Sequence, residues 1–169
     1  LTSRMSSLVI RPLALRLAMT PQSITDIIGV RRAIEAECAY LAAERATPAQ
    51  LDALDARLKE IADAGSDTEA AARADFALHI EIARVAGNPI LFDVLSYLSD
   101  LIYQSHLETT RAHGTIRPAA QSHHVRIVDA IKRGNADTAR RLMLDHLYEV
   151  ERSYRDKVLR NDAPTSHAK

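Results

Sequence analysis

The chain has 169 residues, of which 47% are apolar and only 4% aromatic, and tryptophan is absent. A chain of this length forms one domain that can bury a continuous core without disulfides or structural metals. Its apolar residues are mostly alanine and leucine, which favours helices packed on helices. Lysine plus arginine equal aspartate plus glutamate at 22 each, so no overall positive field attracts a polyanion. This balance argues against nucleic-acid binding by these residues alone.

Cysteine usage and hydropathy indicate the cellular environment. The single cysteine, Cys38, excludes a disulfide within the chain and agrees with a reducing compartment. No stretch approaches the roughly 20 apolar residues that span a bilayer, and the first residues lack the features of a signal peptide. We therefore expect a soluble, cytoplasmic protein that does not associate with a membrane.

The first dozen residues differ from the rest of the chain, because they are rich in serine and β-branched residues and alternate weakly. A helical pattern then begins at Ser23, and apolar residues recur at helical spacing to about Arg45. The sequence Thr47-Pro48-Ala49-Gln50 offers an N-cap, a proline at the first helical position and a glutamine at the third. It predicts the start of a second amphipathic helix.

A polar break at 65–67 precedes a third helix, which Gly87 and Asn88 end. The fourth helix, from Ile90 to about Thr109, is apolar on much of its circumference, as expected of a central element. The fifth runs from about 119 to 133 and the sixth from 136 to about 159, with a polar, disordered tail over 160–169. The pattern predicts an all-α protein, an antiparallel bundle of six to seven helices.

Chemistry-bearing residues lie on the inner faces of three of these helices. Asp75 and His79 are four residues apart in the third helix, so their side chains share one face and can reach one ion together. In the fifth helix, the helical period places His124 on the apolar stripe and the adjacent His123 at its edge. In the sixth helix, His146 lies on the apolar stripe.

A buried carboxylate and three buried imidazoles all need partners, and one divalent cation would satisfy all four. Asp75, His79, His124 and His146 are therefore the predicted metal ligands. Zinc is the first candidate, with nickel, manganese or iron as alternatives, since this ligand set suits each of them. The competing interpretation is that Asp75 and His79 form a surface pair or a hydrogen bond in the core. His106 and His113 flank the loop after the fourth helix and are interpreted as solvated residues.

Arg31 lies on or near the inner stripe of the first helix, four residues before Glu35. Its two-pronged guanidinium could receive a carboxylate of a small ligand. An ion pair with Glu35 within the helix is an equally good explanation, so both interpretations stay open.

Several segments together resemble a known family, namely VRRAIE (30–35), ADFALHIEIARVAGNPIL (74–91), HVRIVDAI (124–131) and ARRLMLDHL (139–147). In order and spacing they are similar to the C-terminal ligand-binding (FCD) domain of FadR-like GntR-family transcription regulators. The resemblance implies an all-helical effector domain around a central cavity for a metal and a ligand, in which one aspartate and three histidines hold the metal and a small carboxylate binds beside it. By motif these ligands are again Asp75, His79, His124 and His146, and the arginine that faces the cavity is Arg31.

The same resemblance implies the organisation of the whole regulator. Residues 1–20 resemble a remnant of the wing and interdomain linker of a winged-helix DNA-binding domain, and 21–159 form the effector domain. DNA would be bound only through that N-terminal domain, which this chain does not include, and a homodimer is expected. The chain is thus interpreted as a sensor of a small organic acid and not as an enzyme. The alternatives are a metal-dependent hydrolase or lyase at the same four residues, and a purely structural metal in an oligomerisation module.

Overall fold

The computed structural model describes residues 23–96, 98, 103 and 118–161, and these residues form helices and no strand. The labelled helices are α2 (Ser23–Arg45), α3 (Pro48–Asp63), α4 (Thr68–Val85), α6 (Pro118–Lys132) and α7 (Ala136–Asn161). A further helical segment covers 89–96. The predicted all-α architecture is confirmed. Beyond residue 96, only residues 98 and 103 of the predicted fourth helix are among the described residues, and both are helical. No described helix is both long and apolar enough to cross a bilayer.

The helix boundaries follow from local side-chain chemistry. Thr47 caps α3, and the side chain of Gln50 accepts a hydrogen bond from the backbone of Thr47, which completes the predicted capping box. Asp67 caps α4 by accepting hydrogen bonds from two backbone N–H groups of its first turn. After α4, Gly87 adopts a positive φ of 68°, a conformation that glycine adopts without strain. The side chain of Asn88 then caps the segment 89–96.

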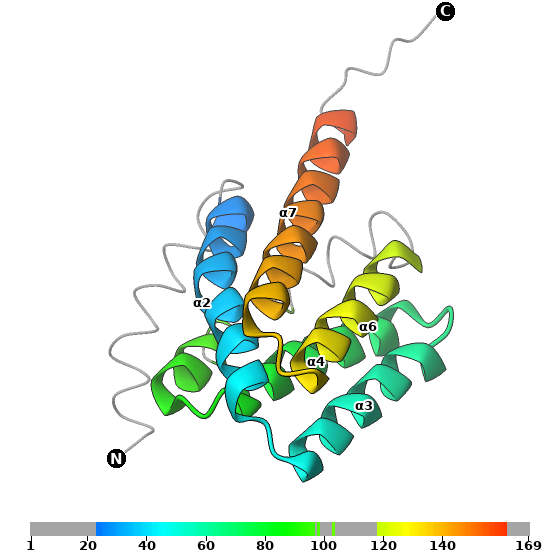
Figure 1. Ribbon diagram of the computed structural model, residues 1–169. Coiled ribbons are helices and arrows are strands. Elements are labelled where there is room, and N and C mark those ends of the chain that lie inside the picture. Colours follow the sequence, from blue (N-terminus) through cyan, green and yellow to red (C-terminus); the bar gives the residue numbers. More distant parts are fainter. Residues whose placement is uncertain (1–22, 97, 99–102, 104–117, 162–169) are drawn as a thin grey trace, which may run out of the picture.

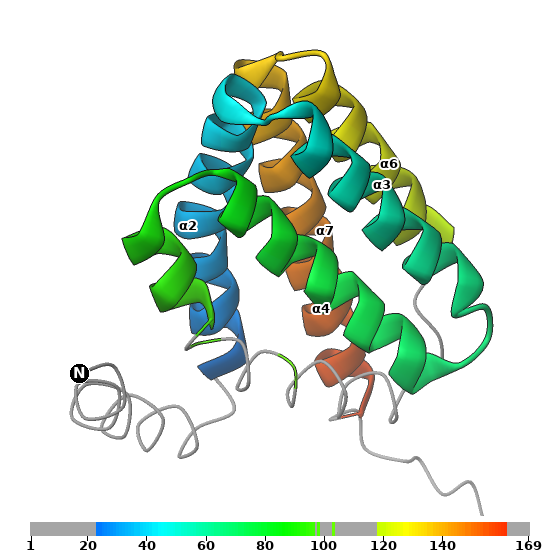
Figure 2. The same cartoon turned by 90° about the horizontal axis from the view of Figure 1, so that it is seen from below.

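Helix α2 packs against α4, α6 and α7, while α3 packs against α4 and α6, and α6 also packs against α7 (Figures 1 and 2). The first half of α2 contacts the second half of α7, where Arg32 forms an ion pair with Glu151. The second half of α2 contacts the start of α7, where the guanidinium of Arg140 lies 4.1 Å from the centre of the Tyr40 ring. These contacts show that α2 and α7 run antiparallel.

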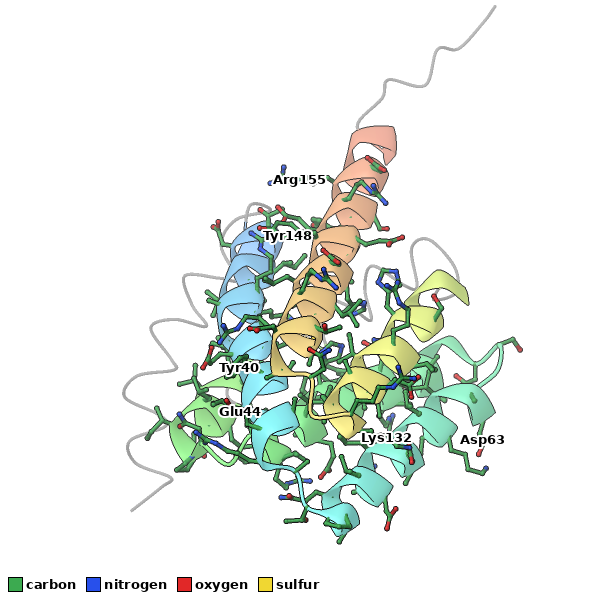
Figure 3. All side chains as sticks on the ribbon, in the orientation of Figure 1. Tyr40, Glu44, Asp63, Lys132, Tyr148 and Arg155 are labelled. Atoms are coloured by element: carbon green, nitrogen blue, oxygen red, sulfur yellow. The ribbon has the colours of Figure 1, made fainter. Side chains whose placement is uncertain are left out.

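The outer edge of the α2–α7 contact is formed by arginine and tyrosine side chains. Arg32 also lies 4.6 Å from the centre of the Tyr148 ring, and Figure 3 shows Tyr40 and Tyr148 along this side of the molecule. Attraction between a cation and the face of an aromatic ring stabilises such contacts. The long stems of the arginines therefore cover apolar surface while their charges stay near water.

The core is built from the apolar faces of all the labelled helices. Alanines on α2 and α4 allow the helix backbones to approach closely, and leucine, isoleucine and methionine fill the space between the outer helices. The apolar side chains with an exposed fraction of at most 1% are Cys38, Ala39, Ala42, Leu54, Ala72, Leu78, Ile82, Ala83, Ala86, Leu95, Ile127, Val128, Ala139, Met143 and Leu147. This core surrounds the polar residues described below.

We predict that Leu54→Ala lowers the free energy of unfolding by about 2–5 kcal/mol, because it leaves a cavity where α3 packs on its neighbours. Leu54 is completely buried. The matched control is Ile90→Ala, at a side chain that is 68% exposed, for which we expect a change within about 0.5 kcal/mol. Urea denaturation followed by circular dichroism, with a chelator in all samples, measures both. Equal midpoints for the two variants would contradict the described packing of α3.

Candidate metal centre

Four polar side chains meet in the interior of the bundle. Asp75 and His79 come from α4, His124 from α6 and His146 from α7, and all four residues are buried. Each offers one ligand atom, and these atoms lie within 4.8 Å of one another. The structure therefore brings together the four residues singled out in the sequence, although binding of a metal to them stays a prediction.

Helical periodicity explains why these side chains converge. On α4, residues 75, 79, 82 and 86 lie on one face, and Ile82 and Ala86 of that face belong to the core. On α6, the His124 side chain is 1% exposed whereas that of His123 is 21% exposed. The choice of His124 over His123 as the inward-facing residue is thus confirmed. His123 instead lies 3.5 Å from the carboxylate of Glu149.

The distances between the ligand atoms are short. Oδ1 of Asp75 lies 3.0 Å from Nε2 of His124, and this nitrogen lies 3.3 Å from Nε2 of His146. Donor atoms bonded to one ion at about 2.1 Å lie at most about 4.2 Å apart. The most distant of the four atoms, within 4.8 Å of one another, would have to approach by about half an ångström to occupy opposite positions on an octahedral ion. For tetrahedral zinc, whose donor atoms lie about 3.4 Å apart, they would have to approach by about 1.4 Å.

The two ring nitrogens of His79 have different surroundings. Its Nδ1 lies 2.5 Å from Oε2 of Glu35 on α2, and its Nε2 is buried without a hydrogen bond to any described residue. A buried polar atom without a partner is costly, and such atoms are rare in folded proteins. The nitrogen of His79 that remains for a ligand is therefore Nε2.

Arg31 and Glu35 form a buried ion pair beside the cluster. Nε of Arg31 lies 2.6 Å from Oε1 of Glu35, and their side chains are 6% and 2% exposed. Of the two interpretations of Arg31, the structure shows the ion pair with Glu35. Contact of Arg31 with a small-molecule ligand stays a prediction.

The electrostatics of the site favour an ionised Glu35. Burial opposes ionisation of this carboxyl group, but Arg31 and His79 outweigh that effect and lower the pKa of Glu35 to about 2. The same carboxylate raises the pKa of Arg31, although burial acts in the opposite direction. Glu35 therefore carries a negative charge at neutral pH and only accepts hydrogen bonds.

His146 is held in its neutral form. Burial, together with the neighbouring His124 and His79, lowers the pKa of His146 well below its usual value, and Asp75 opposes this only in part. A neutral imidazole offers a nitrogen lone pair, which is the form that binds a metal.

The sequence pattern indicated Glu35 only as a partner of Arg31 and did not predict its contact with the histidine cluster. Its spacing of four from Arg31 and its position on the inner stripe of α2 were visible signals. Its contact with His79, 44 residues away, is tertiary and leaves no local pattern. His106 and His113 lie outside the described residues.

Comparison with known proteins relates this arrangement to a family. Residues 26–149 match the family model of the FCD domain. The chain is 32% identical to the HTH-type transcriptional regulator LutR of Bacillus subtilis, with 83% of this chain and 66% of the relative covered. It is 33% identical to a putative L-lactate dehydrogenase operon regulatory protein of Escherichia coli, over 82% of this chain and 54% of the relative. It is also 33% identical to the HTH-type transcriptional repressor NanR of Escherichia coli, over 79% of this chain and 51% of the relative.

Solved structures support the same fold. A GntR protein of Streptococcus agalactiae has a TM-score of 0.69 at 24% identity, over 82% of this chain and 64% of that chain. The Escherichia coli McbR/YncC protein has a TM-score of 0.73 at 16% identity, over 82% of this chain and 70% of that chain.

The chain spans about half to two thirds of the length of the curated relatives. These relatives are named as regulators, so the expectation that the chain is not an enzyme is confirmed by its relatives. The chain therefore belongs to the FCD domain family of GntR-type transcription regulators.

Proposed function

We propose that this FCD domain is a metal-dependent sensor of a small carboxylate, in a regulator of the FadR-like group. One observation carries the proposal: four buried donor atoms from three helices lie within 4.8 Å of one another. The buried Nε2 of His79, which has no hydrogen-bond partner among the described residues, supports it. A divalent cation would bind the four donor atoms together and give Nε2 of His79 a partner.

The donor set favours a first-row transition metal. Three imidazoles and one carboxylate suit zinc first, and nickel, manganese or iron as alternatives. Hard ions such as magnesium and calcium prefer oxygen ligands, so they fit this site less well. With four protein ligands, an octahedral ion keeps two positions for a ligand oxygen or water. When bound, the metal would supply a Lewis-acid site for such an oxygen.

The charges around the cluster favour an anionic effector. The charges of Arg31 and Glu35 cancel each other. A divalent cation carries two positive charges and Asp75 one negative charge, so the loaded site would have a net charge of about one positive unit. A carboxylate bound at the open positions would neutralise that excess in a buried region, where an unbalanced charge is costly. One relative is named after an operon for L-lactate dehydrogenase, whose substrate is a small hydroxy acid, and this supports the same class of effector. We further propose that a donor of Arg31 not engaged by Glu35 contacts the effector.

We propose that DNA is bound by another domain of the regulator and not by this FCD domain. Two of the relatives are named as HTH-type regulators and are longer than this chain. We propose that a winged-helix domain outside the described residues binds DNA in a homodimer. The effector would control DNA binding through its different affinity for two arrangements of the helices.

We predict that the metal-free protein binds one equivalent of zinc, and that His124→Ala and Asp75→Asn each weaken this binding. Removing a residue that only supports a metal ligand lowers metal affinity by roughly 10- to 100-fold. These variants change a ligand itself, so we expect zinc affinity to fall by more than that. Titration against a chromophoric zinc chelator measures the affinity.

The matched control for this prediction is His123→Ala. His123 precedes a predicted ligand in the same helix, but it is partly exposed and pairs with Glu149. Its zinc affinity should stay within about twofold of wild type, because no donor atom is lost. Full zinc affinity in His124→Ala and Asp75→Asn would contradict the ligand assignment.

We predict that small carboxylates raise the melting temperature only when the protein contains metal. The reason is mass action, since a ligand that binds only the folded, loaded protein adds about 2.7 kcal/mol at a concentration 100 times its Kd. Differential scanning fluorimetry with L-lactate, malate and citrate, with and without zinc, measures the shift. Glycerol serves as the uncharged control. An equal shift in metal-free protein would show that carboxylates bind elsewhere.

A further inference from the structure

Glu35 connects two helices through two different oxygens. Oε1 lies 2.6 Å from Nε of Arg31 on the same helix, α2, and Oε2 lies 2.5 Å from Nδ1 of His79 on α4 and 3.4 Å from Nη2 of Arg31. The Glu35 side chain is only 2% exposed. A carboxylate in this position is held from both sides and has little freedom to turn away.

This contact determines which nitrogen of His79 carries the hydrogen. A carboxylate only accepts hydrogen bonds, so Nδ1 of His79 must donate to it. In a neutral imidazole the other nitrogen, Nε2, then keeps its lone pair. Nε2 is the buried nitrogen that has no hydrogen-bond partner among the described residues. The lone pair is thus presented to the cluster formed with Asp75, His124 and His146.

We propose that Glu35 is a positioning residue of the metal centre, which fixes the tautomer and ring orientation of His79 so that Nε2 faces the ion. This inference rests on the proposed function. It adds a residue of α2 to a site whose four ligands come from α4, α6 and α7. Carboxylates that hold the far nitrogen of a ligating histidine commonly increase its basicity and the metal affinity.

The contact of a ring nitrogen with a carboxylate on its outer side distinguishes His79 from His124. The corresponding nitrogen of His124, Nδ1, is buried and has no hydrogen-bond partner among the described residues. A carboxylate partner is therefore not shared by all three histidines of the cluster. Arg31 in turn holds the second oxygen of Glu35, so the chain of contacts runs from Arg31 through Glu35 to His79.

A pair of double variants isolates the hydrogen-bond acceptor. Arg31→Met with Glu35→Gln keeps a side-chain oxygen that can accept from His79, whereas Arg31→Met with Glu35→Met has nearly the same length and no such acceptor. Both lack the buried charges, and replacement of a buried ion pair by uncharged side chains of similar volume is often tolerated. Circular dichroism confirms that each variant is folded.

The first measurement is the tautomer of His79 in metal-free protein, from the nitrogen-15 shifts of its ring. We expect hydrogen on Nδ1 in the wild type and in the Gln-containing double variant. The Met-containing double variant should lose this preference. Hydrogen on Nε2 in the wild type, or an unchanged tautomer in the Met-containing variant, would overturn the proposal.

The second measurement is zinc affinity by chelator competition. The Met-containing double variant should bind zinc about 10- to 100-fold more weakly than the Gln-containing one, the usual cost of losing such a partner. Equal affinities would overturn the positioning role. If the wild type binds no zinc, the proposed function and the positioning of a metal ligand both fail, and the tautomer measurement still decides whether Glu35 orients His79. Should the Met-containing variant not fold, the Glu35→Gln single variant decides. There Arg31 takes the single amide oxygen and the amide NH2 faces Nδ1 of His79, so we expect the hydrogen to move to Nε2. Hydrogen retained on Nδ1 would contradict the proposal.

Discussion

The ion pair of Arg31 with Glu35 lies inside the bundle, where neither side chain is more than 6% exposed. Charges removed from water to this extent are stable only if each polar atom has a partner. Glu35 meets this requirement with both oxygens, since Oε1 accepts from Arg31 and Oε2 contacts both His79 and Arg31. The contact holds α2 against α4 at the depth of the histidine cluster. The surrounding apolar core can then be closely packed without leaving a buried charge unpaired.

Much of the fold could be predicted because the relevant signals are local. The capping box at Thr47 and the end of α4 before Gly87 depend on residues within one helical turn of each other. The convergence of the four polar residues could also be anticipated, since each follows from the apolar stripe of its own helix. Periodicity distinguished His124 from His123 for the same reason.

The contacts that were not predicted join residues that are far apart in the chain. Glu35 and His79 are 44 residues apart, and Arg32 and Glu151 are 119 apart. No spacing rule connects such positions, because the approach of two helices depends on the packing of the whole bundle. For Arg31 the sequence allowed two interpretations, since an arginine on an inner stripe can face a ligand or an acid of its own helix. Only the position of the Glu35 side chain distinguishes them.

The turn between α6 and α7 also bears on how the site assembles. Gly134 adopts a φ of 66° there, and Asn135 caps α7 through the N–H of Thr138. His124 and His146 thus lie on a helical hairpin, only 22 residues apart. Contacts at short separation lose little chain entropy on closing and form early in folding. Two of the three histidines can meet before the bundle is complete, and docking of α4 then adds Asp75 and His79 together.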